Sequence, residues 1–390
     1  DLHLSLRRQR QMCIRDRIYP PEVVEADIHD WRNAVGTGPF ILKDYVEGSS
    51  LTYVRNPLYW GTTTIDGKEY KLPFVDRLVW PIVPDESTRI ATLRTGKCDI
   101  MESVGWRYKE TLQETCPELR VYRTLSTTFT CISPRLDIEE PPFSDIRIRK
   151  AMSMAIDRQA IIDSQMGGEA ELVSAPFSAG WSEDLYTPLE ELPDSAKELY
   201  EYNPEKAKQL LAEAGYPDGF KAEMVILNLG TAPDLAAMIA DYWSEIGIDV
   251  ELKPYEYGAY LALMFSKRFK HIYLRYKGNG DPFVLSWIAG DPSYRGNSAM
   301  YDDPYFRERL EALDQEPDAA KAKQALKELN VYLIEQCPYI FLPVGYNYAY
   351  AWPWAKNWYG ELNANARSPG QIHARVWIDR DLKYKMIGQR

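Results

Sequence analysis

The sequence predicts an α/β protein made of at least two compact units. A chain of 390 residues is too long to fold around a single hydrophobic core of ordinary size. The pattern of apolar residues predicts a strand at Lys221–Leu227, a helix at Pro233–Ile246 and a strand at Ile248–Leu252. Hydrophobic residues make up 45% of the chain and charged residues 26%, which is typical of a globular protein. No uninterrupted apolar run is long enough to cross a bilayer.

The first elements follow glycine-rich and aromatic turns. GTGPF at residues 36–40 predicts a tight turn, because glycine adopts backbone angles that other residues avoid. NPLYW at residues 56–60 predicts a second turn with an aromatic cap. The expected elements are strands at Phe40–Tyr45, Leu51–Arg55 and Val75–Val83, a helix at Glu86–Thr95 ended by Gly96, and a strand starting at Cys98.

The segment Pro142–Asp163 predicts a helical hairpin. Ile148, Met152 and Ala155 recur at helical spacing and define one buried face, while the basic residues of the same helix fall elsewhere. Asp157 is placed to cap a second short helix, which the glycine pair 167–168 ends. On periodicity alone this is an ordinary buried hairpin.

The remaining chain alternates helices and short strands. Asn203 and Pro204 open a helix that Gly215 closes, because asparagine caps helices and proline suits the first helical position. The further expected elements are a helix at Glu256–Phe265, a strand at His271–Tyr276, helices at Tyr301–Leu313 and Asp318–Gln336, and a strand at Pro338–Val344.

Charge and cysteine content exclude several classes of function. The net charge of −11 argues against a nucleic-acid partner, because phosphates require a basic surface. The five cysteines form no CxxC pair and the four histidines are scattered, so we expect no metal and no cofactor. An odd number of cysteines leaves the redox compartment open. These residues are Cys13, Cys98, Cys116, Cys131, Cys337, His3, His29, His271 and His373.

Residues 1–17 differ in character from the rest. They contain five arginines against two aspartates and show no periodicity. No apolar segment follows the charges, so they do not form a signal peptide. The string resembles translated sequencing-adapter read-through. We expect native sequence to begin near Ile18 and the true N-terminal part to be missing; a natural basic arm is the alternative.

Four ordered motifs resemble those of family 5 extracellular solute-binding proteins, the receptors of peptide, nickel and opine-type ABC importers. They are GTGPF with NPLYW, VPDESTR with TGKCD, PFSDIRIRKAMSMAID, and YNPEKAKQLLAEAGYPDGF. The resemblance runs from about Trp31 to Asp379. It implies a two-lobed periplasmic-binding-protein fold with lobe I at 18–131, incomplete at its N-terminus, lobe II at 132–345, and a return segment at 346–390.

The same resemblance implies a receptor. Such a protein captures a small peptide- or sugar-like solute in a cleft between its lobes and delivers it to the permease subunits of an ABC importer. The expected location is the periplasm or the outer face of the cytoplasmic membrane, free or lipid-anchored, after export by a signal peptide that this sequence lacks. We expect a monomer.

Two other classes stay open. A hydrolase-type enzyme would use carboxylates in the cleft, but the sequence holds no GxSxG, HExxH, P-loop or GxGxxG motif. We therefore expect no enzyme activity. A sensor or chaperone that kept the binding fold would lack a permease partner.

Six residues are the expected ligand contacts. Aromatic rings and amides suit recognition, because each offers apolar and polar surface. Simple packing is the alternative for each, and a turn acid before proline is the alternative for the aspartate. The six are Trp106, Tyr276, Asn279, Asp281, Trp287 and Tyr346.

Two departures from the family's motifs bear on the ligand. Peptide receptors hold the ligand's amine with an acid shortly before an Asp-Pro pair, and here Gly278 takes that position. Dipeptide receptors offer an arginine in the loop that corresponds to residues 228–233, which has none here. Each lost charged anchor would cost about 1.5–3 kcal/mol. An uncharged or sugar-like ligand therefore fits better than a short peptide with free ends, and the isolated histidines disfavour bare nickel.

Overall fold

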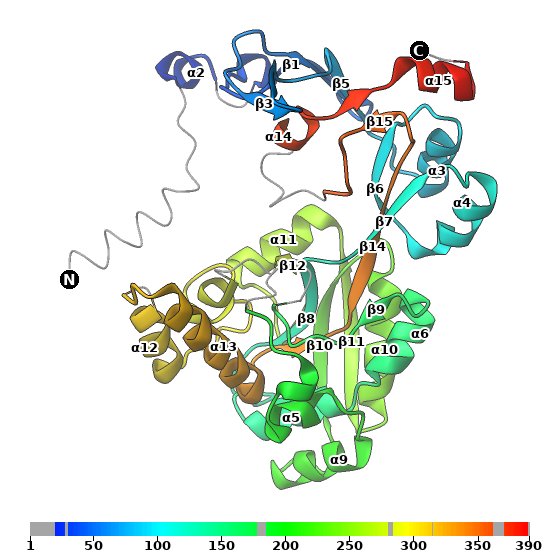
Figure 1. Cartoon of the computed structure of the whole chain (residues 1–390). Helices are drawn as coiled ribbons and strands as arrows, with labels where there is room; N and C mark the ends of the chain where they lie inside the picture. Colours follow the sequence, from blue (N-terminus) through cyan, green and yellow to red (C-terminus); the bar gives the residue numbers. More distant parts are fainter. Residues whose placement is uncertain are drawn as a thin grey trace. The chain divides into compact units, whose positions relative to one another are not determined.

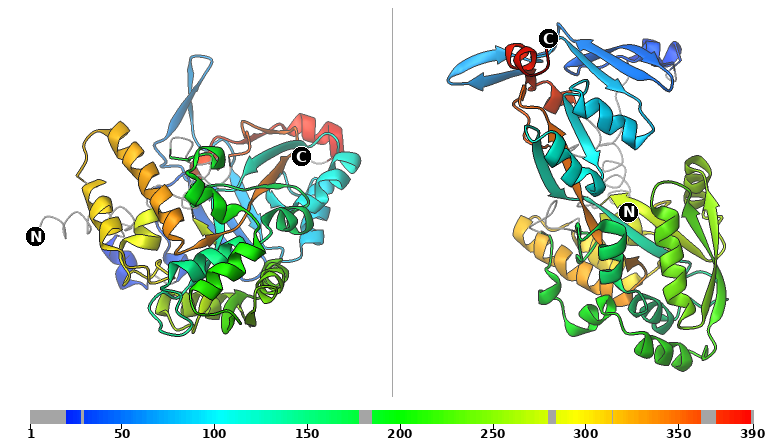
Figure 2. Two further views of the ribbon diagram at one scale, coloured as in Figure 1. Left: turned by 90° about the horizontal axis from the view of Figure 1, so that it is seen from below. Right: turned by 90° about the vertical axis from the view of Figure 1, so that its right-hand side faces the viewer.

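The computed structural model describes residues 20–27, 30–177, 185–279, 284–313, 315–361 and 370–388. The chain divides into two compact units (Figures 1 and 2). Unit 2 contains Gly105–Arg107 and Arg123–Tyr348. Unit 1 contains Tyr108–Tyr122, the described residues up to Val104, and those from Ala349 onward. The lobe boundaries stated above stay predictions.

Unit 2 is built on a five-stranded sheet in the order β11-β10-β12-β8-β13. Its strands are β8 (Thr128–Pro134), β10 (Phe220–Leu227), β11 (Ile248–Tyr255), β12 (Ile272–Asn279) and β13 (Ile340–Phe341). β10 runs parallel to β11 and β12, whereas β8 is antiparallel to both β12 and β13. The start of β8 therefore lies at the same edge as the carboxyl ends of β10 and β12.

Alternate residues of these strands enter separate apolar clusters on the two faces of the sheet. Ile132, Met224 and Leu274 belong to one cluster, while Cys131, Val225 and Tyr273 belong to clusters on the opposite face. This follows from the two-residue period of a strand. Both faces of the sheet are therefore buried under helices, as expected for an α/β unit.

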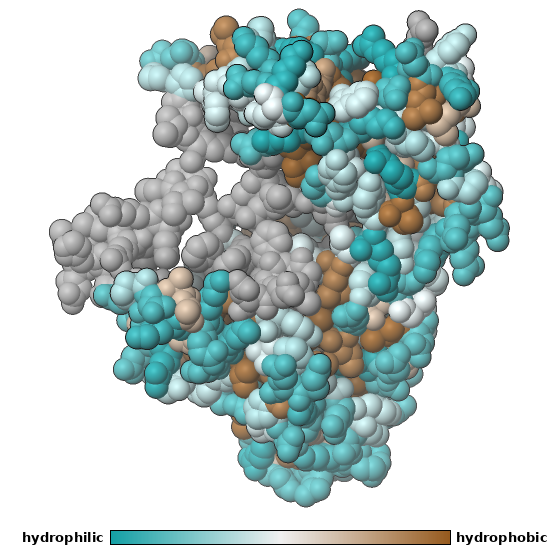
Figure 3. All heavy atoms as spheres, in the orientation of Figure 1, coloured by the Kyte–Doolittle hydropathy of each residue, from teal (hydrophilic) through white to brown (hydrophobic). Residues whose placement is uncertain are grey.

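The helices of unit 2 follow this division. The first face is covered by α5 (Ile146–Met154), α6 (Arg158–Met166), α8 (Asp194–Lys197), α9 (Pro204–Glu213) and α10 (Ala232–Ser244). The second face is covered by α11 (Tyr257–Ser266), the π-helix η5 (Ser286–Gly290), α12 (Pro304–Leu313) and α13 (Ala319–Gln336). The short elements are β9 (Ala170–Glu171), η3 (Leu189–Glu191) and η4 (Glu198–Tyr200). In Figure 3 the visible surface over α5 and α9 is mainly hydrophilic.

The predicted hairpin is confirmed as α5 and α6. Ile148, Met152 and Ala155 are fully buried. The Asp157 carboxylate accepts a hydrogen bond from the Ala160 amide at 2.9 Å and so caps α6. Gly167 ends α6 with a positive φ of 58°, which glycine adopts without strain.

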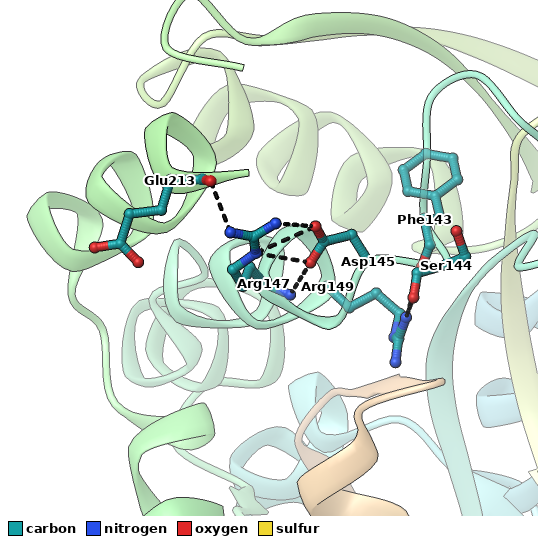
Figure 4. A network of polar contacts seen from close by, with 6 residues as sticks. All are labelled: Phe143, Ser144, Asp145, Arg147, Arg149 and Glu213. Atoms are coloured by element: carbon teal, nitrogen blue, oxygen red, sulfur yellow. Dashed lines mark hydrogen bonds and ion pairs between the residues drawn. The ribbon is translucent and has the colours of Figure 1, made fainter. Parts of the chain in front are cut away.

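Arg149 is buried, which periodicity did not indicate. Its guanidinium donates to the carbonyl oxygens of Phe143, Ser144, Gln336 and Cys337 at 2.6–3.0 Å. Figure 4 shows it pointing away from its neighbour Arg147, which pairs with Asp145 instead. Desolvation lowers the pKa of Arg149, and the carbonyl dipoles replace the lost water.

The strand expected at Pro338–Val344 is two strands. β13 ends at Phe341, and β14 runs from Val344 to Ala351. Pro343 lies between them and has no N–H to continue a ladder. Arg158 fixes the first piece, since its Nε donates to the Phe341 carbonyl at 3.0 Å. The tyrosines at 346, 348 and 350 therefore lie on strand β14.

Unit 1 contains smaller sheets. β1 (Phe40–Val46), β2 (Ser50–Arg55) and β5 (Arg77–Pro81) form an antiparallel sheet, and β3 (Thr62–Ile65) pairs with β4 (Lys68–Lys71). β15 (Ala355–Lys356) pairs with β16 (Trp377–Ile378). A further sheet has the order β6-β14-β7, with β6 at Ile100–Val104 and β7 at Arg120–Leu125. Its strands β7 and β14 each contribute residues to both units. The helical elements are α2 (Pro21–Glu25), η1 (Trp31–Asn33), α3 (Glu86–Arg94), α4 (Lys109–Thr115), α14 (Gly370–His373) and α15 (Arg380–Ile387). The short helix η2 (Trp106–Tyr108) begins in unit 2 and ends in unit 1.

Tryptophans form the centre of unit 1. The rings of Trp352 and Trp354 stack with centroids 4.6 Å apart and planes 3° apart. Their indole nitrogens donate to the Leu93 carbonyl and to Asp99, which join this stack to α3 and to the start of β6. Within the described residues, no helix combines the length and the apolar character that a membrane span requires.

Candidate functional site

Residues at the carboxyl edge of the unit 2 sheet change from apolar to polar. On β8 the residues that share a face run from Ile132 in the core to Thr130 and Thr128. On β12 the same face carries Leu274, whereas Tyr276, at an irregularity in the pairing with β8, packs against the cluster of Val225 and Tyr273. In open α/β sheets this edge is where ligands bind, because the loops there separate and leave backbone groups accessible. The sequence therefore builds a polar surface at the end of an apolar core.

A cavity of about 140 Å³ lies at this edge. Its walls come from the start of β8, the end of α6, the start of α10, the end of β12 and the start of β14. None of the described residues that line it is charged. They are Ser126, Thr128, Thr130, Gln165, Met166, Thr231, Leu235, Tyr276, Pro343, Val344, Gly345, Tyr346 and Asn347.

Several polar side chains in this cavity are available to a ligand. Within the described part of the chain, the side chains of Thr130, Gln165, Thr231 and Asn347 form no hydrogen bond to another residue. Polar groups in a half-buried wall need partners, which water or a ligand must supply. The arrangement thus offers hydroxyl and amide groups for an uncharged, hydrogen-bonding molecule.

Tyr346 is held in place from three directions. Its amide donates to the Glu169 carbonyl at 2.9 Å. Its hydroxyl donates to the Glu171 carboxylate. The Arg123 guanidinium lies over its ring, 3.2 Å from the centroid. The ring is therefore a fixed wall rather than a mobile side chain.

Arg123 is itself oriented by unit 2. Its Nε donates to Glu169 at 2.9 Å and to the Tyr348 hydroxyl at 3.2 Å. Burial alone would lower the pKa of Arg123, but the hydrogen bonds to Glu169 and Tyr348 outweigh it and raise that pKa. The guanidinium stays charged at every relevant pH.

Of the expected contacts that the structure describes, some line this cavity and others lie outside it. Tyr276 and Tyr346 line the cavity. Trp106 packs against Gly167, next to the cavity residue Met166. Trp287 lies half-buried in η5, outside the residues that line this cavity.

The other two expected contacts are Asn279 and Asp281. Asn279 pairs with Thr128 in the β-ladder, so its backbone lies at the edge of the sheet where the cavity is. Asp281 lies outside the described residues. All six stay predictions as ligand contacts.

Sequence reasoning missed the small polar residues of the cavity and Arg123. Threonine and serine occur throughout the chain, so composition does not single them out. The usable signal was the position of Thr128 and Thr130 at the start of a strand whose same-face neighbour, Ile132, enters the core. Arg123 gave no signal, because its partners lie 46 and 225 residues away.

A larger cavity of about 830 Å³ lies in unit 1 against β5 and β6. Charged residues contribute to its wall, among them Arg77, Glu102 and Lys97. Burial raises the pKa of Glu102, while the charge of His373 opposes that rise. Size alone does not identify a binding site, and this cavity contains none of the expected contacts. The cavity of unit 2 is therefore the stronger candidate.

Within the described residues, no group of three or more His, Cys, Asp or Glu side chains is arranged to hold a metal ion. The four cysteines described are free thiols. Burial raises the pKa of Cys131 to about 12, so this thiol is neutral and unreactive.

Comparison with known proteins decides the family. Residues 18–305 match the model of bacterial extracellular solute-binding proteins, family 5 Middle. The chain belongs to this family. Family 5 is a family of solute-binding proteins, which agrees with a hydrogen-bonding cavity and with the predicted two-lobed α/β fold.

Two curated relatives of this family 5 chain bind different ligands. The heme-binding protein A of Haemophilus influenzae is 30% identical over 329 residues, which is 81% of this chain and 55% of that protein. The dipeptide-binding protein of Escherichia coli is 26% identical over 326 residues, which is 80% of this chain and 56% of that protein. The chain thus spans a little over half the length of these relatives.

Solved structures show the same fold. The periplasmic binding protein DppA from Helicobacter pylori, in complex with the peptide STSA, superimposes with a TM-score of 0.71 at 23% identity. The match covers 88% of this chain and 63% of that one. The predicted fold class and family are confirmed.

Proposed function

We propose that this chain is the solute-binding part of an extracytoplasmic receptor that serves an ABC importer. The unit 2 cavity would hold the uncharged, polar part of a small peptide-like or oligosaccharide-like solute. Binding without turnover is expected, since the cavity wall carries hydroxyls and amides rather than an acid–base pair. The permease subunits would then accept the solute from the loaded receptor.

One observation carries this proposal: four polar side chains that have no hydrogen-bond partner among the described residues converge beside Tyr276 and Tyr346, at the edge of the mixed sheet where β10 and β12 end. Hydroxyls and amides pair with peptide groups or sugar hydroxyls equally well. Tyrosine rings supply apolar area for the rest of the ligand. A cavity of about 140 Å³ holds only part of such a molecule, so the ligand must extend beyond it.

The relatives support the location and the range of ligands. The H. pylori protein is named as periplasmic and associated with an ABC transporter, and the E. coli relative is named for dipeptides. We infer a periplasmic or membrane-anchored location for this chain. We also infer a monomeric receptor.

Calorimetric titration of the full chain tests the proposal. The probes are trialanine, maltotriose and heme, each measured against wild type and two variants. Thr130→Val and Tyr276→Phe each remove one hydroxyl from the cavity, which should weaken binding of a bound probe roughly two- to tenfold. Tyr257→Phe is the matched control, because its side chain is 59% exposed and lies outside the cavity.

Two results would contradict the proposal. Absence of binding for all three probes would remove the receptor function. Equal affinities for wild type, Thr130→Val and Tyr276→Phe would move the site away from this cavity.

A further inference from the structure

Arg123 presents an open pair of nitrogens beside the cavity. Only its Nε is engaged, by Glu169 and Tyr348. Among the described residues, Nη1 and Nη2 have no hydrogen-bond partner. The side chain is 44% exposed, so a solute can reach these two nitrogens. The guanidinium lies over the ring of Tyr346, and Tyr346 lines the cavity, so Arg123 lies beside it.

The guanidinium is fixed before any ligand arrives. Arg123 lies on β7, and Tyr346 and Tyr348 lie on the neighbouring strand β14 (Figure 1). Glu169 binds one edge of the guanidinium and is itself only 14% exposed. Stacking at 3.2 Å on the Tyr346 ring restricts rotation about the side chain. A planar donor pair that is held this way loses little entropy on binding.

The geometry favours a carboxylate as the bound group. Two parallel N–H donors in one plane match the two oxygens of a carboxylate. Glu169 and Glu171 lie next to the site and bring negative charge. They repel a phosphate dianion more strongly than a singly charged carboxylate. A neutral carbonyl would use one of the two donors and leave the other unpaired.

We propose that Nη1 and Nη2 of Arg123 bind a carboxylate of the solute, with the uncharged remainder in the unit 2 cavity. This deepens the proposed function, on which it rests, and names an anionic end in the ligand. The sequence predicted an uncharged ligand instead, because no arginine occurs in residues 228–233. Arg123 supplies a charged anchor from another strand.

Titration of the full chain with a matched pair of probes tests this assignment. N-acetyl-trialanine carries a carboxylate and no amine, and its C-terminal amide differs only at the proposed anchor. Wild type should bind the acid about tenfold more tightly than the amide. Arg123→Gln should abolish this preference, so that this variant binds the acid and the amide with equal affinity.

Glu169→Gln separates binding from positioning. Glutamine keeps an oxygen that accepts from Nε but removes the neighbouring negative charge. If Arg123 binds the carboxylate, the affinity for the acid should rise in this variant and that for the amide should hold. If Arg123 only supports Tyr346, both probes should respond alike.

The failure outcomes are distinguishable. Equal affinity of wild type for acid and amide, or an unchanged preference in Arg123→Gln, overturns the carboxylate anchor and leaves the receptor proposal standing. If the acid fails to bind at 10 mM while the amide or maltotriose binds, the carboxylate anchor is likewise overturned and the receptor proposal stands. Absence of binding by acid, amide and maltotriose overturns both proposals.

Discussion

The two units differ in how completely their sheets are covered. In β10 of unit 2, five of eight residues are buried, namely Ala222 and the four from Met224 to Leu227. In β1, β2 and β5 of unit 1, Thr52 is the one buried residue. Ile41, Val46 and Val79 of that sheet are each more than 40% exposed. Alternation of apolar residues forms strands in both units, but among the described residues helices cover both faces of the main sheet in unit 2 alone.

This difference indicates where stability and binding reside. A sheet covered on both faces gains the full hydrophobic free energy of its apolar side chains. It also gives a rigid edge, and the cavity lies at that edge. The exposed apolar residues of unit 1 contribute little to stability in this chain. The comparison predicts that equivalent changes act very differently in the two units.

The largest expected effect is that of Trp243→Ala. Trp243 is fully buried, and its indole N–H donates to the Met152 carbonyl at 2.8 Å. Its loss leaves a cavity in the core of unit 2 and should lower the free energy of unfolding by about 3–5 kcal/mol. The matched change Trp60→Ala, at a side chain 79% exposed in unit 1, should alter it by less than about 0.5 kcal/mol. Urea denaturation measures both, and equal losses would abolish the contrast.

The next effect is that of a buried arginine in unit 2. The Arg158 guanidinium donates to the carbonyls of Ser153 and Phe341 and has no carboxylate partner among the described residues. Burial lowers its pKa to about 10. Arg158→Met keeps most of the volume but leaves those carbonyls without donors, which should cost about 1–3 kcal/mol.

Arg268→Met is the control for this change, because Arg268 is exposed. Its effect on urea denaturation should stay below about 0.5 kcal/mol. An increase in stability for Arg158→Met would show that the buried charge costs more than its hydrogen bonds return.

These arginines mark the limit of what sequence could predict of the fold. Ile148, Met152 and Ala155 were placed correctly, because helical periodicity reports which side faces a core. Arg149 and Arg158 were not, since some of their acceptors come from residues 336–341, far along the chain. Pro343 divided the expected strand for a local reason that its missing N–H explains.

The site was less predictable for the same reason. Tyr276 and Tyr346 were chosen for their residue type, and they line one cavity. Trp287 was chosen on the same ground and lies elsewhere in unit 2. Residue type reports chemistry, whereas convergence depends on strand order, and the sheet order β11-β10-β12-β8-β13 is not written in any local pattern.

The smallest expected effect lies in unit 1 and depends on pH. Asp85 caps α3 by accepting from the amide and hydroxyl of Thr88 and the hydroxyl of Ser87. These side-chain hydrogen bonds lower its pKa from 3.8 to about 2. Because the folded pKa is the lower one, the contribution is present above pH 4 and is lost as pH falls toward 2.

Hydrogen exchange of the α3 amides between pH 4 and pH 2 measures this cap. Asp85→Asn keeps a capping oxygen without a titrating group, so it should remove the pH-dependent part of the protection. Identical pH profiles in wild type and Asp85→Asn would show that the cap does not depend on this ionisation.

The central claim is that solute binds at the carboxyl edge of the unit 2 sheet. Amide hydrogen exchange of the full chain, with and without saturating N-acetyl-trialanine, tests it most directly. The account predicts slower exchange at residues 126–130 and 344–347, where β8 and β14 begin. Unchanged exchange in both segments, with protection confined to the unit 1 cavity beside β5 and β6, would contradict it.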